Sequence, residues 1–450
     1  LVPLDAQALP LFARQTGQNC LACHAGGQFP VLTPYGRKFK LTGYTIGSRS
    51  DVPLSVMLQA GVARVSNTTN GTLNDPNGGG GNGLSPNDTF PRNGLPTVTQ
   101  ASLFAGGRIT DNIGLFGQWT LDPYAYQNGA GKWSSHSATD QFDLRYADRL
   151  IDGKRDLIFG FSLNNNVGNT DVWNTFNNPF QSVPTPIGPS SLQGNIFTGP
   201  PITPMINSGL QAAGVNAYAY WNDTVYAEVG LYRNANKIFS FMSQGTDNNG
   251  TSVLSGGNPY WRLALNHDWG PHSAMVGLHG MDGRMLSTPG DIGSPIIHNQ
   301  DVGIDGQYQY NLDPHTVTAQ FSYTHERQSY DGALLGVTAT NSSNTLDYLK
   351  LNGTYIYQAK YGASLSYVTT KGSADSTLYT ANAISGSANN SPNTKVWIPE
   401  VFWTPVQYMR IGLQYYKYTQ FMGGNQGYDG VSSRSAGDNN LLFLYFWGAY

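Results

Sequence analysis

The pattern of hydrophobic and polar positions changes near residue 50. From Leu54 onward, segments of about ten residues alternate apolar or aromatic side chains with Gln, Asp, Glu, Lys or Gly, as in 225–231 and 413–418. Such alternation places the two kinds of side chain on opposite faces of an extended strand. Residues 1–50 lack this alternation. The pattern therefore predicts a head, residues 1–50, and an all-β domain, residues 51–450.

The links between the alternating segments also differ in length. Seven tight turns are predicted near 111–112, 152–154, 222–223, 270–271, 311–314, 358–359 and 404–405. Eight long links, rich in Gly, Asn and Ser, are predicted at 67–95, 127–136, 167–208, 235–256, 286–298, 329–343, 372–392 and 422–438. Together they join about 16 strands, with short turns at one rim and long loops at the other, as in outer-membrane barrels. The sequence predicts an antiparallel transmembrane β-barrel of about 16 strands.

Two soluble all-β folds also contain many short strands. A β-propeller would show an internal repeat of about 40–50 residues with a recurring blade motif, and the sequence has none. A soluble sandwich would leave the outward Tyr, Leu and Trp side chains as exposed apolar patches. The rhythm of the links therefore favours the membrane barrel. A barrel of about 16 strands encloses a lumen that its own side chains do not fill, so the lumen either conducts or is plugged.

The composition excludes several classes of protein. Charged residues make up 12% of the chain, against roughly 25% in an ordinary soluble domain. The 25 Lys and Arg are balanced by 28 Asp and Glu, with no basic block, so nucleic-acid binding has no electrostatic basis. A net charge of −3 and 12% aromatic residues argue against disorder. No apolar run reaches the ~18 residues of a membrane-spanning helix.

The two cysteines, Cys20 and Cys23, bear on the compartment. The chain opens at Leu1 without a basic and apolar leader, so it is expected to be either cytosolic or the mature form of an exported protein. A long chain with no other cysteine suits an oxidising compartment. We therefore expect an exported protein, and the strand pattern predicts that it lies in the lipid of the bacterial outer membrane.

The candidate chemistry lies in the head, in the motif Cys20-Leu-Ala-Cys23-His24. In Cys-x-x-Cys-His, the two thiols add across the vinyl groups of haem and the adjacent His ligates the iron. A thioredoxin-like redox pair would need a βαβ context, which is missing. Structural zinc would need four ligands, and no second Cys/His pair lies nearby. A simple disulfide is the remaining alternative. The motif favours one covalently attached c-type haem.

The opposite side of the iron has no obvious ligand in the head, which contains no Met and no His besides His24. Apolar residues at alternate positions of 273–285 are expected to face lipid, and the same argument applied to the first strand leaves candidates that face the lumen. The candidates are Met275, Met281, His279 and Met57. Met409 and His267 share the phase of lipid-facing residues and are excluded. Met275 or Met281 is favoured, while packing roles, water or an open position remain alternatives.

Two runs in the head, FARQTGQNCLACH at 12–24 and FPVLTPYGRKFKLTGYT at 29–45, resemble the head of the fused monohaem cytochrome–porins, outer-membrane proteins of iron-oxidising bacteria. Beyond these runs the resemblance lies in architecture and length. It implies that Cys20 and Cys23 attach haem and that His24 is the proximal ligand. It also implies that further residues pack the haem edge, namely Phe29, Pro30, Tyr35 and Arg37. Tyr35 stands where Phe is expected, which is a mild departure.

The resemblance implies an iron-oxidising electron-transfer cytochrome. Extracellular Fe(II) would give one electron to the haem, which would pass it to a periplasmic acceptor, either a c-type cytochrome or a blue-copper protein. Two alternatives stay open: a substrate-conducting porin with an accessory haem, and a conduit for a different reduced donor. The head is expected to plug the lumen. The proline-rich link 167–208 is expected either to fold over or into the mouth, or only to cover the surface.

Overall fold

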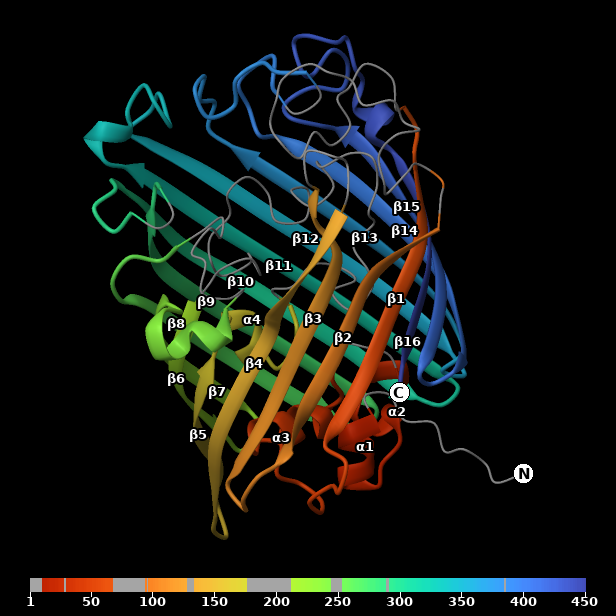
Figure 1. Cartoon of the computed structure of the whole chain (residues 1–450). Coiled ribbons are helices and arrows are strands. Elements are labelled where there is room, and N and C mark those ends of the chain that lie inside the picture. The colour runs from red at the N-terminus through yellow and green to blue at the C-terminus, as the bar shows by residue number, and fades with distance from the viewer. Residues whose placement is uncertain are drawn as a thin grey trace.

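The computed structural model describes residues 10–27, 30–67, 94, 96–127, 133–175, 212–243, 253–288, 291–383 and 386–450. Within these ranges, sixteen strands form one closed barrel (Figure 1). Each strand pairs antiparallel with its neighbours in sequence, and β1 closes the barrel by pairing with β16. The prediction of an all-β, antiparallel barrel of about 16 strands is confirmed.

The strands run over the following residues. The first eight are β1 Leu54–Val65, β2 Pro96–Arg108, β3 Ile113–Gln127, β4 Trp133–Ile151, β5 Asp156–Asn164, β6 Ala212–Trp221, β7 Val225–Asn234 and β8 Asn258–Trp269. The last eight are β9 His272–Leu286, β10 Ile296–Leu312, β11 His315–Tyr330, β12 Ser343–Tyr357, β13 Tyr361–Gly372, β14 Thr394–Val406, β15 Met409–Gln420 and β16 Leu441–Ala449.

The described helices are short and lie either in the head or in the links between strands. The head contains α1 Pro10–Thr16, α2 Cys20–Cys23, η1 Ala25–Gly27 and α3 Pro34–Leu41. The links contain α4 Val167–Thr170, η2 Lys237–Met242, η3 Gly332–Leu334 and η4 Ala436–Asn439. None of the helices in the described part of the chain is long and apolar enough to cross a membrane.

The predicted alternation of short and long links is confirmed. Short turns join β2 to β3, β4 to β5, and so on to β14 and β15, and longer links join the remaining neighbours. One turn is misplaced in the prediction: 404–405 lies within β14, and the chain reverses between Val406 and Met409. Pro405 suggested a turn, but it lies where the pairing register shifts between Trp403 and Val406. Proline is tolerated at such irregular positions of a strand.

Alternation along each strand separates an outer and an inner face. On β7, Val229 and Leu231 point outward and are 62% and 57% exposed, whereas Tyr226 and Tyr232 are buried inside the barrel. Outward apolar side chains on a closed barrel with one short-turn rim and one long-loop rim are the features of an outer-membrane protein. The chain is a porin-like barrel of the bacterial outer membrane, as predicted.

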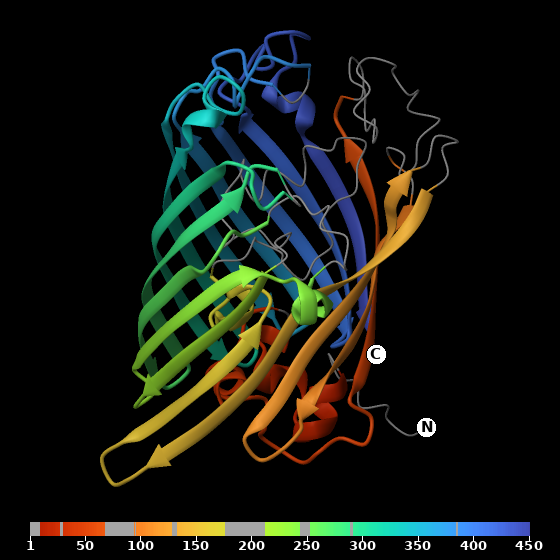
Figure 2. The same ribbon diagram turned by 60° about the vertical axis from the view of Figure 1, so that its left-hand side comes forward.

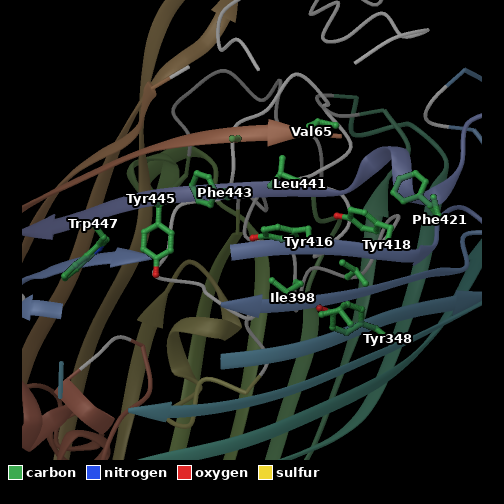
Figure 3. Packing of buried hydrophobic residues seen from close by; sticks show 14 of the residues in the cluster. Val65, Tyr348, Ile398, Tyr416, Tyr418, Phe421, Leu441, Phe443, Tyr445 and Trp447 are labelled. Atoms are coloured by element: carbon green, nitrogen blue, oxygen red, sulfur yellow. The ribbon is translucent and has the colours of Figure 1, made fainter. Parts of the chain in front are cut away.

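Aromatic side chains line part of the inner face. Figure 3 shows buried side chains along β15 and β16, including Tyr416, Tyr418, Tyr445 and Trp447. Leu11 of α1 belongs to the same buried cluster. The inner surface of this wall is therefore packed, and it contacts the head at its lower end.

The barrel wall is uneven in height. Strands β5, β6 and β7 have 9, 10 and 10 residues, whereas β10, β11 and β12 have 17, 16 and 15. Figure 2 shows the wall of β5–β7 ending well below the tops of β10–β15 at the long-loop rim. Both views place α1–α3 inside the opposite rim, where the short turns lie (Figures 1 and 2).

Candidate functional site

The head is built from helices whose ends are capped by its own side chains. Helix α2 begins after Asn19, whose side chain accepts a hydrogen bond from the Ala22 N–H at 3.2 Å. Helix α3 begins after Thr33, with Pro34 at its first position, and the Thr33 hydroxyl accepts from the Gly36 N–H at 3.2 Å. Such caps give partners to N–H groups that a helix leaves unbonded, and proline at the first position is preorganised for a helix.

Cys20, Cys23 and His24 lie on one tight turn. Both cysteines belong to α2. The His24 N–H donates to the Cys20 carbonyl at 2.8 Å. His24 is extended, with φ −120° and ψ 134°, and forms an isolated β-bridge with Leu32. The turn therefore brings the two sulfurs and the imidazole of the sequence motif onto one short stretch of backbone.

Helix α3 packs closely against this turn. The Thr33 N–H donates to the Cys23 carbonyl at 2.9 Å, and the Thr33 hydroxyl donates to the Ala22 carbonyl at 2.5 Å. A Cβ at Gly36 would overlap the Cys23 carbonyl oxygen. Only glycine allows this approach, so the motif and α3 form one unit.

Burial sets the protonation of the motif. Burial, together with the neighbouring Cys20, raises the pKa of the Cys23 thiol to about 11. Burial lowers the pKa of His24 to about 4, against the opposing effect of a hydrogen bond with the backbone of Val31. At neutral pH the imidazole is therefore uncharged, which is the form that ligates metals. Two adjacent thiols followed by a neutral imidazole fit the donor set of a c-type haem.

Arg37 attaches the head to the wall at β8, β9 and β10. Its guanidinium lies 3.2 Å from the Asp268 carboxylate and donates to the Ser273 hydroxyl at 2.7 Å and to the Gln309 side chain at 3.2 Å. It also donates to the Leu32 carbonyl within the head at 3.1 Å. Arg37 is only 2% exposed. This residue, which the resemblance assigns to haem packing, ties the Leu32 segment to three strands of the wall.

Tyr44 and Leu41 attach the head to a second part of the wall. The Tyr44 hydroxyl donates to the Asp143 carboxylate on β4 at 2.6 Å. The Tyr218 hydroxyl on β6 donates to the Leu41 carbonyl at 2.6 Å. Asp143 is fully buried and also accepts from Arg145 at 2.7 Å. The head is therefore bonded to strands on more than one side of the lumen.

The long link after β5 turns into the lumen, and we call its described part, 165–175, the inward segment. The Trp173 carbonyl accepts hydrogen bonds from Gln307 of β10 at 2.7 Å and Gln320 of β11 at 3.1 Å. The Thr175 carbonyl accepts from Lys350 of β12 at 2.6 Å. The link 167–208 was expected either to fold over or into the mouth or only to cover the surface. Its described part, 167–175, lies in the lumen, and 176–208 lie outside the described residues.

The inward segment rests on the head and on a buried ionic cluster. Its Asp171 carboxylate lies 3.5 Å from Arg262, which also pairs with Asp305 at 2.7 Å. All three side chains are fully buried. The Asp171 carbonyl accepts from Lys40 of the head at 3.3 Å, and the Asn174 side chain donates to the Pro30 carbonyl at 3.0 Å. The head, the inward segment and the wall form one packed assembly across the lumen.

The remaining head residues that the resemblance singles out have different surroundings. Pro30 contacts the inward segment through its carbonyl. Tyr35 is half-buried in the first turn of α3. Phe29 lies outside the described residues. The role of these residues in packing a haem edge stays a prediction.

The four candidate ligands face inward, as their strand phase predicts, but they lie in different surroundings. Met275 packs in a buried cluster with Leu41 of the head and Trp173 of the inward segment. Met281 belongs to another cluster, formed by the wall and the inward segment. His279 lies 3.4 Å from Asp305, and Met57 accepts from the Trp447 indole N–H at 3.0 Å.

The two excluded residues behave as their phase predicts. His267 is exposed on the outer face and stacks on Trp269. Met409 is half-buried at the start of β15, in phase with the exposed Leu413. In the described part of the chain, no three His, Cys, Asp or Glu side chains gather as a metal site.

The sequence did not predict the ionic cluster of Asp171, Arg262 and Asp305. Arg262 and Asp305 alternate with exposed apolar residues such as Leu263 and Ile304, which places both charges on the inner face. A charged residue on the inner phase of a strand was therefore a usable signal. Their partner Asp171 gave no such signal, because it lies in an irregular link without periodicity.

Comparisons with known proteins find resemblance only among solved structures. No family model and no curated protein matches the chain. The outer membrane channel DcaP of Acinetobacter baumannii is similar over 88% of this chain and 96% of its own, with 13% identity and a TM-score of 0.47. OmpT of Vibrio cholerae, in a trimer form, covers 88% and 98%, with 10% identity and a TM-score of 0.45. An anion-selective porin from Comamonas acidovorans covers 88% and 98%, with 11% identity and a TM-score of 0.42. Likenesses this distant carry no argument about function.

Proposed function

We propose that this barrel is an electron conduit of the outer membrane. One c-type haem would be attached through Cys20 and Cys23, with His24 as the proximal ligand of its iron. Extracellular Fe(II) would be the donor, and a periplasmic c-type cytochrome or blue-copper protein the acceptor. The observation that carries the proposal is a Cys-x-x-Cys-His turn held inside the lumen of a membrane barrel.

The reaction is a one-electron transfer between metals. Fe²⁺ becomes Fe³⁺ outside the cell, and the electron passes to the acceptor with no bond made or broken and no proton moved. Bound haem would supply the iron couple that accepts and releases this electron. The chain would hold the imidazole neutral and fix its orientation through the Leu32 bridge and the Arg37 contacts.

The packing of the lumen supports a conduit over an open channel. Side chains that line a water-filled pore stay hydrated, whereas Arg262, Asp305 and Lys350 are at most 1% exposed. Burying such charges is costly unless they are paired, and here Arg262 and Asp305 pair with each other. The head and the inward segment would therefore close the barrel to solutes while an electron can still cross.

The barrel itself supports a second candidate function, a substrate-conducting porin with an accessory haem. Barrels of about 16 strands commonly enclose an aqueous channel, and the wall here is of that size. A conduit for a reduced donor other than Fe(II) would use the same residues as the main proposal. Conductance separates the porin from both conduits, and reduction kinetics separate the donors.

The test uses the intact haem-loaded protein. Rapid mixing of the oxidised protein with Fe²⁺ should produce the absorption band of reduced haem, and planar-bilayer conductance should be small. Cys20→Ser combined with Cys23→Ser should abolish the absorption of covalently attached haem. His24→Gln should alter the haem spectrum and slow haem reduction by Fe²⁺. His267→Gln is the matched control, because that histidine is exposed on the outer face and should leave both readouts unchanged. Colourless wild-type protein, or large conductance with no response to Fe²⁺, would overturn the proposal.

The ligand opposite His24 is tested separately. A thioether ligand gives the ferric protein a weak sulfur-to-iron band at the red end of its spectrum. We expect Met275→Ala to abolish that band, because Met275 packs with Leu41 of the head. Met281→Ala and Met57→Ala are the comparison variants. Loss of the band only in Met281→Ala would move the assignment to that residue, and a wild-type spectrum without the band would favour His279, water or an open position.

A further inference from the structure

A cavity of about 680 Å³ lies on the outer face of the barrel, at the long-loop ends of β5–β9. Its floor comes from outward positions of β5, β6 and β7, and its sides from η2 and from 253–257 and 292. Most of its lining is apolar: Leu163, Val215, Leu231, Phe239, Leu254 and Ile292. The ionic cluster of the lumen lies on the inner side of the wall, whereas most strand positions that line this outer groove face outward. The lining residue Leu254 packs with Met281 and Val167 at the rim between the two.

The height of the wall places the groove at the membrane surface. A transmembrane strand needs about 9–11 residues, and β5, β6 and β7 have 9, 10 and 10. These strands therefore end where the hydrocarbon ends, and the groove lies at the boundary between acyl chains and headgroups in the outer leaflet. The wall of β10–β12, with 15 to 17 residues in each strand, rises above that level (Figure 2).

The short helix η2 presents apolar side chains beside the groove. Ile238 is 78% exposed and Phe241 is 52% exposed, although both are large and apolar. The helix is anchored, because Met242 is fully buried and its carbonyl accepts a hydrogen bond from Asn165 at 3.2 Å. Exposed apolar side chains on a fixed helix at this depth suit contact with lipid better than contact with water.

Basic side chains predominate around the groove. Arg233 lines the groove and is exposed, and Lys237 begins η2 and is also exposed. Arg284, on the outward face of β9, is exposed two residues before the lining residue Leu286. None of the described residues that line the groove is acidic, and the exposed Asp291 lies next to the lining residue Ile292. An apolar groove with a basic rim complements a lipid that combines acyl chains with an anionic headgroup.

We propose that the outer groove binds one phosphorylated, acylated lipid of the outer leaflet. An acyl chain would lie against Leu231 and Val215, and a phosphate would pair with Arg233 and Lys237. The site is independent of the haem, and its occupant would fill the space above the low wall of β5–β7.

The experiment measures lipid retention by the full-length protein in detergent. A bis-phosphorylated, acylated glucosamine disaccharide is titrated against the protein and followed by native mass spectrometry. One bound lipid per chain is expected. Each basic side chain at a membrane surface contributes on the order of 1 kcal/mol, so Arg233→Gln with Lys237→Gln should weaken binding about 30-fold. Arg327→Gln, an exposed outward arginine on β11, is the matched control and should bind as the wild type does.

A second variant tests the apolar part without removing charge. A Cβ at Gly257 would lie 3.2 Å from the Leu231 side chain, so Gly257→Leu should fill the groove and reduce binding. The folding of each variant is checked by β-sheet circular dichroism, and Leu231→Ser replaces Gly257→Leu if the latter misfolds. Equal binding by the variants, equal binding of the dephosphorylated lipid, or a lipid-free oligomer that Gly257→Leu dissociates would overturn the proposal. The last result would make the groove an interface between copies of the chain.

Discussion

The barrel wall and the head reach their order in opposite ways. The wall is a continuous ladder in which sixteen strands pair with their neighbours, so its backbone bonds and its apolar outer face follow from one repeated pattern. The described helices of the head have 3 to 8 residues. Helices this short are marginal in water on their own. The head therefore owes its order to the wall that surrounds it.

The head's contacts depend on a closed barrel. Arg37 bonds to the ends of β8, β9 and β10, while Tyr44 bonds to β4. The Cys20 N–H donates to Gln407, in the turn between β14 and β15, at 3.3 Å. These strands lie around the whole circumference, so the head can make all its bonds only after the barrel has closed. The loss of stability on disrupting a contact should therefore depend on whether the contact lies within the wall or between the head and its surroundings.

The largest effect is expected inside the wall, at Arg262. Arg262→Leu would leave the fully buried Asp305 without its 2.7 Å partner, and removing one partner of a buried pair costs about 3–5 kcal/mol. The free energy of unfolding in urea, measured in lipid vesicles, should fall by that amount, and conductance should rise as the inward segment loses its anchor.

The double variant Arg262→Leu/Asp305→Leu provides the control. It removes both charges, so it should recover much of the lost stability. If the single variant were as stable as the wild type, the ionic cluster would be hydrated. The wall would then not depend on this buried ion pair for its stability.

A smaller effect is expected at Arg37, which holds the head. Arg37→Gln removes the Asp268 ion pair and the 2.7 Å bond to Ser273. Hydrogen bonds to charged groups contribute about 1.5–3 kcal/mol. The head should become sensitive to protease at lower urea, while the unfolding of the wall stays unchanged. Lys38→Gln is the control, because its ion pair with Asp223 is about a third exposed on both sides and such pairs contribute about 0–1 kcal/mol. Equal effects of both changes would contradict the assignment.

Tyr44→Phe should cost less again. The change removes one 2.6 Å hydrogen bond to Asp143, but that carboxylate keeps its bonds to Arg145 and Ser162, both at 2.7 Å. The expected loss is about 1 kcal/mol, the usual contribution of one such bond, again in protease sensitivity of the head. A loss as large as that of Arg37→Gln would mean that Asp143 depends on Tyr44 for its place in the wall.

The same contrast explains how much the sequence could predict. The strands were predictable because period-2 alternation is repeated sixteen times, and an error at one place, such as Pro405, does not disturb the others. The inward faces of Met275 and His279 follow from the same phase. The Cys20–His24 motif could be singled out because the haem attachment that we propose for it requires a fixed local spacing.

The contacts between the head and the wall could not be predicted. Arg37 and Asp268, or Lys40 and the Asp171 carbonyl, are more than a hundred residues apart in sequence. No local pattern records which inward side chain of the wall meets which residue of the head. That pairing depends on closure of the barrel and on the path of the inward segment, both of which are properties of the whole chain.

An effect of another kind, a pH dependence, is expected at Lys40, where the head meets the inward segment. Burial, aided by the nearby Arg145, lowers the pKa of Lys40 from its ordinary value to about 8. Between about pH 8 and 10.5 the unfolded chain then binds more protons at this group than the folded one, so docking becomes more stable as pH rises through that window. Lys40→Met lacks this dependence. Its urea midpoint for protease cleavage of the head should exceed that of the wild type at about pH 7.5, and the difference should shrink at about pH 10. A difference that stays constant would mean that the ammonium group remains hydrated, and that the head is held less tightly against the inward segment than its 3.3 Å contact with the Asp171 carbonyl indicates.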